Sequence, residues 1–156
     1  MPRHTETKLL PYTAEQMFGL VADIDRYPEF LPWCTGARVL RRDGDVLTAD
    51  LDIGYGPLHE RFTSRVTLTH PTRIDVAYQR GPFRRLENHW TFAPAPGGCA
   101  VGFHIDFEFR SFLLRHLIGG VFGRAVDHMV ASFEARAAHM FGPVAPAKLK
   151  PGRAKA

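Results

Sequence analysis

Between residues 36 and 110, hydrophobic and polar side chains alternate along the chain in several short runs. Residues 99–109 show this most clearly, because every second side chain is large and hydrophobic while those between are small or polar. A period of two is typical of strands that bury one face. Turn sequences such as Asp43-Gly44 and Pro96-Gly97-Gly98 separate the runs. The pattern predicts six antiparallel strands with one hydrophobic face and one solvated face.

The first 33 residues predict a further strand and one short helix. Residues 3–10 precede a proline and are typical of a first, edge strand. Thr13 and Gln16 have the spacing of a capping box and predict a helix over about 13–22. Two prolines interrupt residues 24–33, which are therefore expected to form one more helical turn and a loop that covers hydrophobic side chains.

After Arg110 the hydrophobic period changes to 3.6 and predicts one long helix over roughly 111–141. This helix is the only element long enough to cover the hydrophobic face of the sheet. We therefore expect an α+β fold in which about seven curved antiparallel strands wrap around the helix. Because a curved sheet and a straight helix diverge at one end, a hydrophobic tunnel is expected between them. Residues 1–142 would form this single domain, and 143–156 a disordered basic tail.

Charge and composition narrow the range of functions that the protein can have. The formal net charge is +4, and four basic residues of the tail account for all of it, so net charge gives no support for a folded DNA-binding surface. No hydrophobic run is long enough to cross a bilayer and no leader sequence is apparent, so a cytoplasmic protein is expected, with any membrane contact peripheral. Cys34 and Cys99 belong to no metal-binding or redox motif and are expected to be reduced and buried.

Catalytic and metal-binding patterns are not apparent in the sequence. The histidines lack metal-ligand spacing, and His59, His89 and His104 occupy polar strand positions. Four carboxylates, Asp50, Asp52, Asp106 and Glu108, alternate onto the solvated face. Glu29 and Glu87 lie among aromatic residues that could raise their pKa, although surface salt bridges are the favoured interpretation. We expect no catalytic residue, no metal and no cofactor.

Three stretches resemble the coenzyme Q-binding protein family of the START, or polyketide cyclase/dehydrase-like, superfamily. The first is Tyr-Pro-Glu-Phe-Leu-Pro-Trp-Cys at residues 27–34, preceded by Val-Ala-Asp-Ile-Asp-Arg. The second is residues 81–92, and the third is residues 101–110 with the helical stripe that follows. The resemblance runs from about residue 4 to 141 in the same order.

The resemblance implies a helix-grip fold that binds ubiquinone or a related isoprenoid quinone without catalysis and supports respiratory electron transport. By position, Trp90 and Leu86 would line the tunnel, while Phe30 and Trp33 would guard its mouth. The residues expected to contact the ligand are Phe30, Trp33, Tyr78, Phe83, Leu86, Trp90, Phe107, Phe109, Leu117, Phe122 and Met129.

Other interpretations stay open. Bacterial members of the family are also described as ribosome association toxins that block the joining of ribosomal subunits, so the large subunit is an alternative partner. This function requires a basic surface, for which the candidates are Arg38, Arg41, Arg42, Arg61, Arg65, Arg80, Arg84 and Arg85. A polyketide cyclase-like enzyme ranks third and needs a titratable group in the cavity. Peripheral contact with the inner membrane or with respiratory complexes is a further expectation, for which the basic tail is a candidate.

Overall fold

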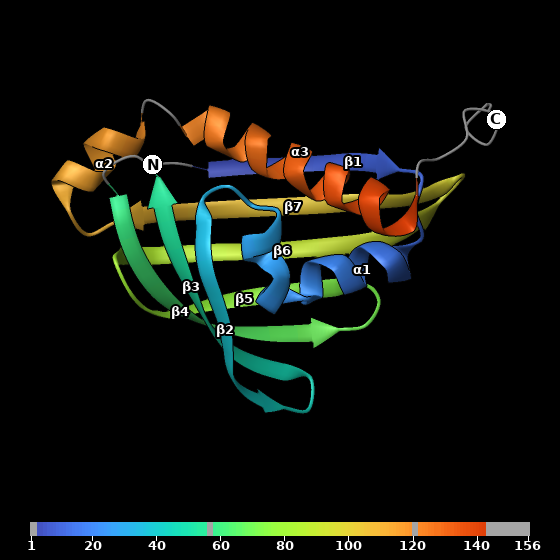
Figure 1. Cartoon of the computed structure of the whole chain (residues 1–156), viewed down its shortest axis with the longest axis horizontal. Coiled ribbons are helices and arrows are strands. Elements are labelled where there is room, and N and C mark those ends of the chain that lie inside the picture. The colour runs from blue at the N-terminus through green and yellow to red at the C-terminus, as the bar shows by residue number, and fades with distance from the viewer. Residues whose placement is uncertain (1–2, 56–57, 120–121, 143–156) are drawn as a thin grey trace.

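The computed structural model describes residues 3–55, 58–119 and 122–142, and Figure 1 shows their arrangement. The elements along the chain are β1 (Arg3–Leu10), α1 (Ala14–Ala22), η1 (Ile24–Glu29), β2 (Cys34–Asp43), β3 (Val46–Tyr55), β4 (Leu58–Thr69), β5 (Arg73–Arg80), β6 (Phe83–Ala95), β7 (Gly98–Phe109), α2 (Phe112–Gly119) and α3 (Phe122–Phe141).

The seven strands form one antiparallel sheet in the order β1-β7-β6-β5-β4-β3-β2. The sheet is curved, and α1, η1 and α3 lie over its concave face (Figure 1). The first strand is an edge strand, as the sequence indicated. The α+β fold, the number of strands and the wrapping of the sheet around a C-terminal helix are confirmed.

The short N-terminal helix begins as its capping pattern predicts. The Thr13 hydroxyl accepts a hydrogen bond from the backbone N–H of Gln16 at 3.0 Å, and the Gln16 side chain accepts one from the N–H of Thr13 at 2.9 Å. Met17, Leu20 and Val21 on one face of α1 are buried against the sheet. The proline-broken segment that follows contains the helical turn η1.

The expectation of one continuous helix over 111–141 is wrong. The chain has two helices, α2 and α3, on either side of residues 120–121, which lie outside the described part of the chain. The sequence at this junction is Gly119-Gly120, and glycine has a low helix propensity. In Figure 1, α3 lies across the sheet while α2 lies beyond the end of β7. Only α3 acts as the gripping helix.

A β-bulge in β6 changes which side chains face inward. Phe83 pairs with Phe109, Arg85 with Glu108 and Leu86 with Phe107, so β6 carries one residue more than β7 over this stretch. Phe83 and Leu86 are three positions apart, yet both pack with the interior aromatic residues because of this extra residue. Strict alternation would have placed them on opposite faces.

Two of the carboxylates expected on the solvated face are buried. Asp50 is 8% exposed and Asp106 is 6% exposed, because neighbouring side chains on the outer face cover them. Asp50 accepts a hydrogen bond from the Thr63 hydroxyl at 2.5 Å and pairs with Arg38 at 3.3 Å. Asp106 pairs with Arg85 at 3.0 Å and with Arg3 at 3.4 Å. The prediction of a solvated position is therefore wrong for these two residues.

The ion pairs of Asp106 predict a pH-dependent contribution to stability. The hydrogen bond from Arg85 lowers the pKa of Asp106 below its usual value. Because the folded pKa is depressed, the pair stabilises the fold above the ordinary aspartate range and loses this effect as the pH falls through the folded pKa. Asp106→Asn should lower the free energy of unfolding by about 1 kcal/mol at pH 7, since Arg3 and Arg85 are partly exposed.

Urea denaturation of wild type and variant at pH 7 and below pH 3 measures this difference. Asp75→Asn, which removes an exposed pair with Arg73, is the control and should change stability less. An Asp106→Asn effect of equal size at both pH values would contradict this account.

Candidate ligand-binding cavity

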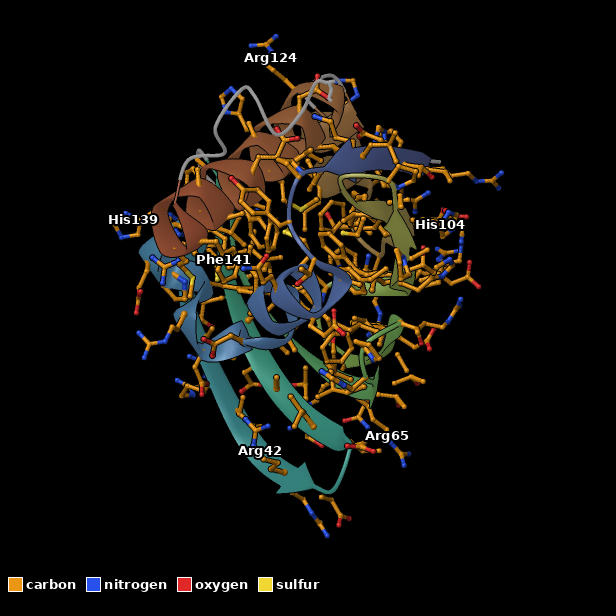
Figure 2. All side chains as sticks on the ribbon, turned by 90° about the vertical axis from the view of Figure 1, so that its right-hand side faces the viewer. Arg42, Arg65, His104, Arg124, His139 and Phe141 are labelled. Carbon is orange, nitrogen blue, oxygen red and sulfur yellow. The ribbon has the colours of Figure 1, made fainter. Side chains whose placement is uncertain are left out.

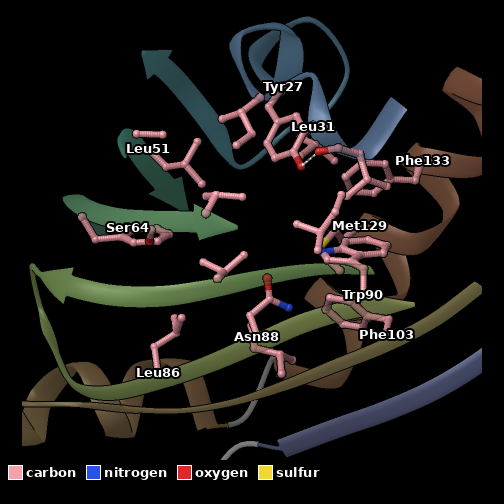
Figure 3. Close-up of a pocket in the computed structure, with 18 of the residues that line it drawn as sticks. Tyr27, Leu31, Leu51, Ser64, Leu86, Asn88, Trp90, Phe103, Met129 and Phe133 are labelled. Atoms are coloured by element: carbon pink, nitrogen blue, oxygen red, sulfur yellow. Dashed lines mark hydrogen bonds between the residues drawn. The ribbon is translucent and has the colours of Figure 1, made fainter. Parts of the chain in front are cut away.

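A cavity of about 120 Å³ lies between the concave face of the sheet and the layer formed by α1, η1 and α3. Figure 3 shows most of the side chains that surround it. The residues that line the cavity are Val21, Ile24, Tyr27, Leu31, Trp33, Ala49, Leu51, Phe62, Ser64, Val66, Ile74, Val76, Leu86, Asn88, Trp90, Phe103, Ile105, Met129 and Phe133. The space expected between the sheet and its helix is therefore present, and its lining is almost entirely hydrophobic.

The volume limits what fits inside. An engineered hydrophobic cavity of about 150 Å³ in another protein binds benzene. A cavity of 120 Å³ therefore has room for roughly one ring and not for a long isoprenoid chain. It is smaller than the tunnel expected from the sequence, and a long tail would have to leave through its open side.

The alternation of the strands explains why these side chains face inward. On β6, Leu86, Asn88 and Trp90 are two positions apart and share the concave face. The same spacing brings Ser64 and Val66 of β4 into the lining. These positions are set by the strand period and do not depend on loops.

The proline-broken segment after α1 closes one side of the cavity and is tied down by its backbone. Leu31 N–H donates to the carbonyl of Tyr27 at 2.9 Å, and Gly54 N–H on β3 donates to the carbonyl of Trp33 at 2.8 Å. Tyr27, Leu31 and Trp33 line the cavity from this segment, and Figure 3 shows the first two. The segment covers hydrophobic side chains, as the sequence predicted.

Aromatic rings form the wall nearest α3. The Trp90 ring centroid lies 4.7 Å from that of Phe103 and 5.1 Å from that of Phe133. Tyr27 meets Phe133 edge to face at 5.6 Å. Such tilted arrangements are the favoured geometry of aromatic pairs. Together the rings make an aromatic wall against which another ring can pack.

Phe30 lies behind this wall and does not line the cavity. Its ring packs edge to face on Phe133 at 5.2 Å, and the Arg136 guanidinium lies 5.1 Å from its centroid. Arg136 in turn donates to Glu29 at 2.7 Å and connects α3 to η1. Phe30 therefore holds the segment against α3.

Glu29 and Glu87, for which the sequence left either a raised pKa or a surface salt bridge open, lie at the surface. Hydrogen bonding from Arg136 holds the pKa of Glu29 below its usual value, and Arg26 adds a second ion pair. Glu87 is exposed, with its carboxylate 4.0 Å from the His104 ring. The salt-bridge interpretation is confirmed for Glu29, whose pKa is lowered and not raised.

Four of the expected ligand contacts belong to a second hydrophobic cluster beside the cavity. Phe83 stacks on Phe109 at 4.8 Å and meets Phe107 edge to face at 5.5 Å. The Tyr78 hydroxyl accepts a hydrogen bond from the backbone N–H of Phe83 at 3.0 Å. These residues pack on one another with Phe62, which touches both the cluster and the cavity.

The expected contacts therefore divide into groups. Trp33, Leu86, Trp90 and Met129 line the cavity. Phe30 supports it, and Tyr78, Phe83, Phe107 and Phe109 form the neighbouring cluster. The side chains of Leu117 and Phe122 lie outside the described part of the structure.

Two polar residues of the lining were missed as site residues. The Ser64 hydroxyl is buried and has no hydrogen-bond partner among the described residues, which costs about 1–3 kcal/mol when a polar group stays unpaired. The Asn88 amide donates to the carbonyl of His104 at 2.9 Å. The strand period could have identified both residues as facing the cavity, because Ser64 occupies an inward position and Asn88 lies midway between Leu86 and Trp90.

The cavity offers little catalytic chemistry. Tyr27 is the one lining residue with a titratable group in the described part of the chain. Its hydroxyl donates to the carbonyl of Val21, and burial raises its pKa. No cluster of three or more metal-ligating side chains occurs among the described residues. No helix in that part of the chain is long and hydrophobic enough to cross a membrane.

Comparison with known protein families gives a match over residues 10–134 to polyketide cyclase/dehydrase and lipid transport proteins. The chain belongs to this family. The chain is a START-like protein of a family that includes lipid transport proteins, and its cavity is lined for a hydrophobic ligand.

Curated relatives carry two kinds of name. The chain is 39% identical over 142 residues to the ribosome association toxin RatA of Escherichia coli strain K12, covering 90% of each chain. It is 34% identical over 144 residues to the mitochondrial coenzyme Q-binding protein COQ10 homolog B of Xenopus laevis, covering 89% of this chain and 59% of that protein.

A solved structure whose sequence identity to this chain is higher than that of these two relatives supports the fold. The 18 kDa protein CC1736 from Caulobacter crescentus is 43% identical, with a TM-score of 0.74 over 92% of this chain and all of that one. The helix-grip arrangement is therefore shared with a related protein of the same size.

Proposed function

We propose that this protein binds ubiquinone or a related isoprenoid quinone without catalysing its conversion, and that it supports respiratory electron transport. The observation that carries the proposal is the ring-sized cavity walled by Trp90, Phe103 and Phe133. The relative named as a coenzyme Q-binding protein supports the choice of ligand. A quinone ring would pack against the aromatic wall.

The half-buried residues of the lining indicate where a tail would leave. Leu51, Val76, Leu86 and Ile105 line the cavity but keep partial solvent exposure. Leu51, Leu86 and Ile105 also pack against the second hydrophobic cluster. An isoprenoid tail leaving there would run over a hydrophobic surface.

The energetics require a contribution from the tail. A ring the size of an aromatic side chain buries about 150–250 Å². At about 25 cal/mol per Å², this burial provides roughly 4–6 kcal/mol before the entropic costs of association. Ring burial alone corresponds to millimolar affinity or weaker. Tail contacts and hydrogen bonds must therefore add to the binding free energy.

Replacing Trp90 tests the position of the ring. Trp90→Ala should weaken the binding of a short-tailed ubiquinone about tenfold or more, because it removes part of the aromatic wall. His89→Ala is the matched control, since His89 is the next residue on β6 and stacks on His104 at 4.9 Å on the outer face. Calorimetry, or fluorescence of Trp33 in the lining, measures the affinity.

Leu86→Ala provides a second variant with a half-buried side chain and should weaken binding in the same direction by less. Circular dichroism establishes that each variant is folded. Equal effects of the Trp90 and His89 substitutions would contradict a ring in this cavity.

A quinone carrier must also reach the membrane that holds its ligand. Phe112 and Leu113 at the start of α2 are 77% and 65% exposed, an unusual position for two adjacent large hydrophobic side chains. We infer that they contact the bilayer peripherally. The basic tail that was expected to make this contact lies outside the described residues.

Vesicle flotation tests the membrane contact. The double variant Phe112→Ser, Leu113→Ser should bind anionic vesicles severalfold less than wild type, because it removes the hydrophobic contact. Leu9→Ser, at a 74% exposed position on the edge strand β1, is the control and should bind as wild type does. Deletion of residues 143–156 measures the contribution of the tail separately. Unchanged flotation of the double variant would contradict a contact through α2.

A second candidate function is association with the ribosome, favoured by the relatives named RatA and by the outer face of the sheet. Arg41 of β2 and Arg65 of β4 both pair in register with Thr48 of β3, so they stand in one row. A surface hollow lies between them. Figure 2 shows Arg65 pointing away from the body of the protein. Exposed arginines in such a row suit contact with phosphates.

Co-sedimentation with large ribosomal subunits tests this candidate. Arg65→Glu should abolish sedimentation at low salt, because it replaces an attractive charge with a repulsive one. Arg124→Glu is the charge-matched control, since Arg124 is exposed on α3 at the opposite end of the molecule (Figure 2). Binding that is equal in both variants, or insensitive to salt, would contradict an interface on this face.

A further inference from the structure

Two polar atoms stand in the otherwise hydrophobic cavity. The amide nitrogen of Asn88 donates to the backbone carbonyl of His104 at 2.9 Å, which fixes the orientation of the amide group. The amide oxygen therefore points the other way, into the space between the lining side chains, as Figure 3 shows. An amide oxygen accepts hydrogen bonds and cannot donate them.

Ser64 supplies the second polar atom. Its hydroxyl is buried in the lining and has no hydrogen-bond partner in the described part of the chain. A hydroxyl can donate or accept, so it suits either kind of ligand oxygen. The Tyr27 hydroxyl is different, because its proton is already donated to the carbonyl of Val21. A buried unpaired hydroxyl and a fixed acceptor that both face the cavity are features of a site built for a polar ligand group.

The register of the strands places these two atoms on opposite sides of the cavity. Ser64 of β4 pairs with Tyr78 of β5, and Asn88 of β6 pairs with Val76 of β5. The two residues are therefore two strand intervals apart across the sheet, about 10 Å, and two residues apart along β5, about 7 Å, which together give a backbone separation of roughly 12 Å. Their side chains converge because the sheet is concave on this side. A six-membered ring with an oxygen on each of two opposite edges, and a hydrogen bond of about 2.8 Å at each, spans a distance of this order.

We propose that the cavity selects the reduced, hydroxyl-bearing form of its ring ligand, a quinol, over the oxidised quinone. The inference rests on the proposed quinone-binding function. A quinone presents only acceptor oxygens, so one of them would face the acceptor oxygen of Asn88 with no proton between them. A quinol can donate one hydroxyl proton to Asn88 while its other hydroxyl bonds Ser64. No redox step is needed, because selection occurs on binding.

The test compares the two forms of one ligand. The probes are a ubiquinone with a single isoprene unit and its quinol, titrated anaerobically by calorimetry. Wild type should bind the quinol about tenfold more tightly, the effect of leaving one buried acceptor unpaired in the quinone complex. Asn88→Leu should abolish this preference by removing the acceptor. Ser64→Ala should weaken both forms and leave their ratio nearly unchanged, because the hydroxyl suits either form.

Val66→Ala is the matched control, since Val66 lines the cavity on the same strand as Ser64 and carries no polar atom. It should weaken both forms equally and leave their ratio unchanged. Equal binding of quinol and quinone by wild type, or a preference for the quinone, overturns the inference while leaving quinone binding intact. Binding of neither form overturns the proposed function itself.

Discussion

The site depends on a packing constraint between a curved sheet and a straight helix. Seven antiparallel strands present a concave hydrophobic face that is wider than α3 can cover. η1 and the loop after it cover part of the remainder, held to β3 by the hydrogen bond between Gly54 and Trp33. The space left over is the cavity, and the strand period determines which side chains of the sheet line it.

Much of this architecture could be predicted from the sequence because it follows from periodicity and capping. The alternation over residues 36–110 predicted the strands, and Thr13 with Gln16 predicted the start of α1. Trp90 and Leu86 were predicted in the lining on the resemblance to a known family, and the structure places both there. Ser64 and Asn88 followed the same period, but polar residues at inward positions carry no sign of whether a partner satisfies them.

The sequence could not predict the features that depend on contacts between neighbouring strands. The bulge between Phe83 and Arg85 brings Phe83 to the inner face, and only the pairing with β7 shows it. The division of the aromatic residues into a wall and a separate cluster depends on three-dimensional packing, which periodicity cannot resolve. Asp106 is buried by arginines from β1 and β6, so its polar position did not imply exposure. The Gly119-Gly120 pair was only a weak sign that the helix is divided, because the hydrophobic stripe continues on both sides of it.

The fold separates two surfaces with different chemistry, a hydrophobic cavity on the concave face and a row of arginines on the convex face. The central claim concerns the first, and nuclear Overhauser effects in a complex with short-tailed ubiquinone test it most directly. The account predicts contacts from the quinone ring to Trp90 and Phe133, with the tail near Leu51 and Leu86. Ring contacts confined to Phe112 and Leu113 on α2, with unchanged signals from the cavity, would contradict it.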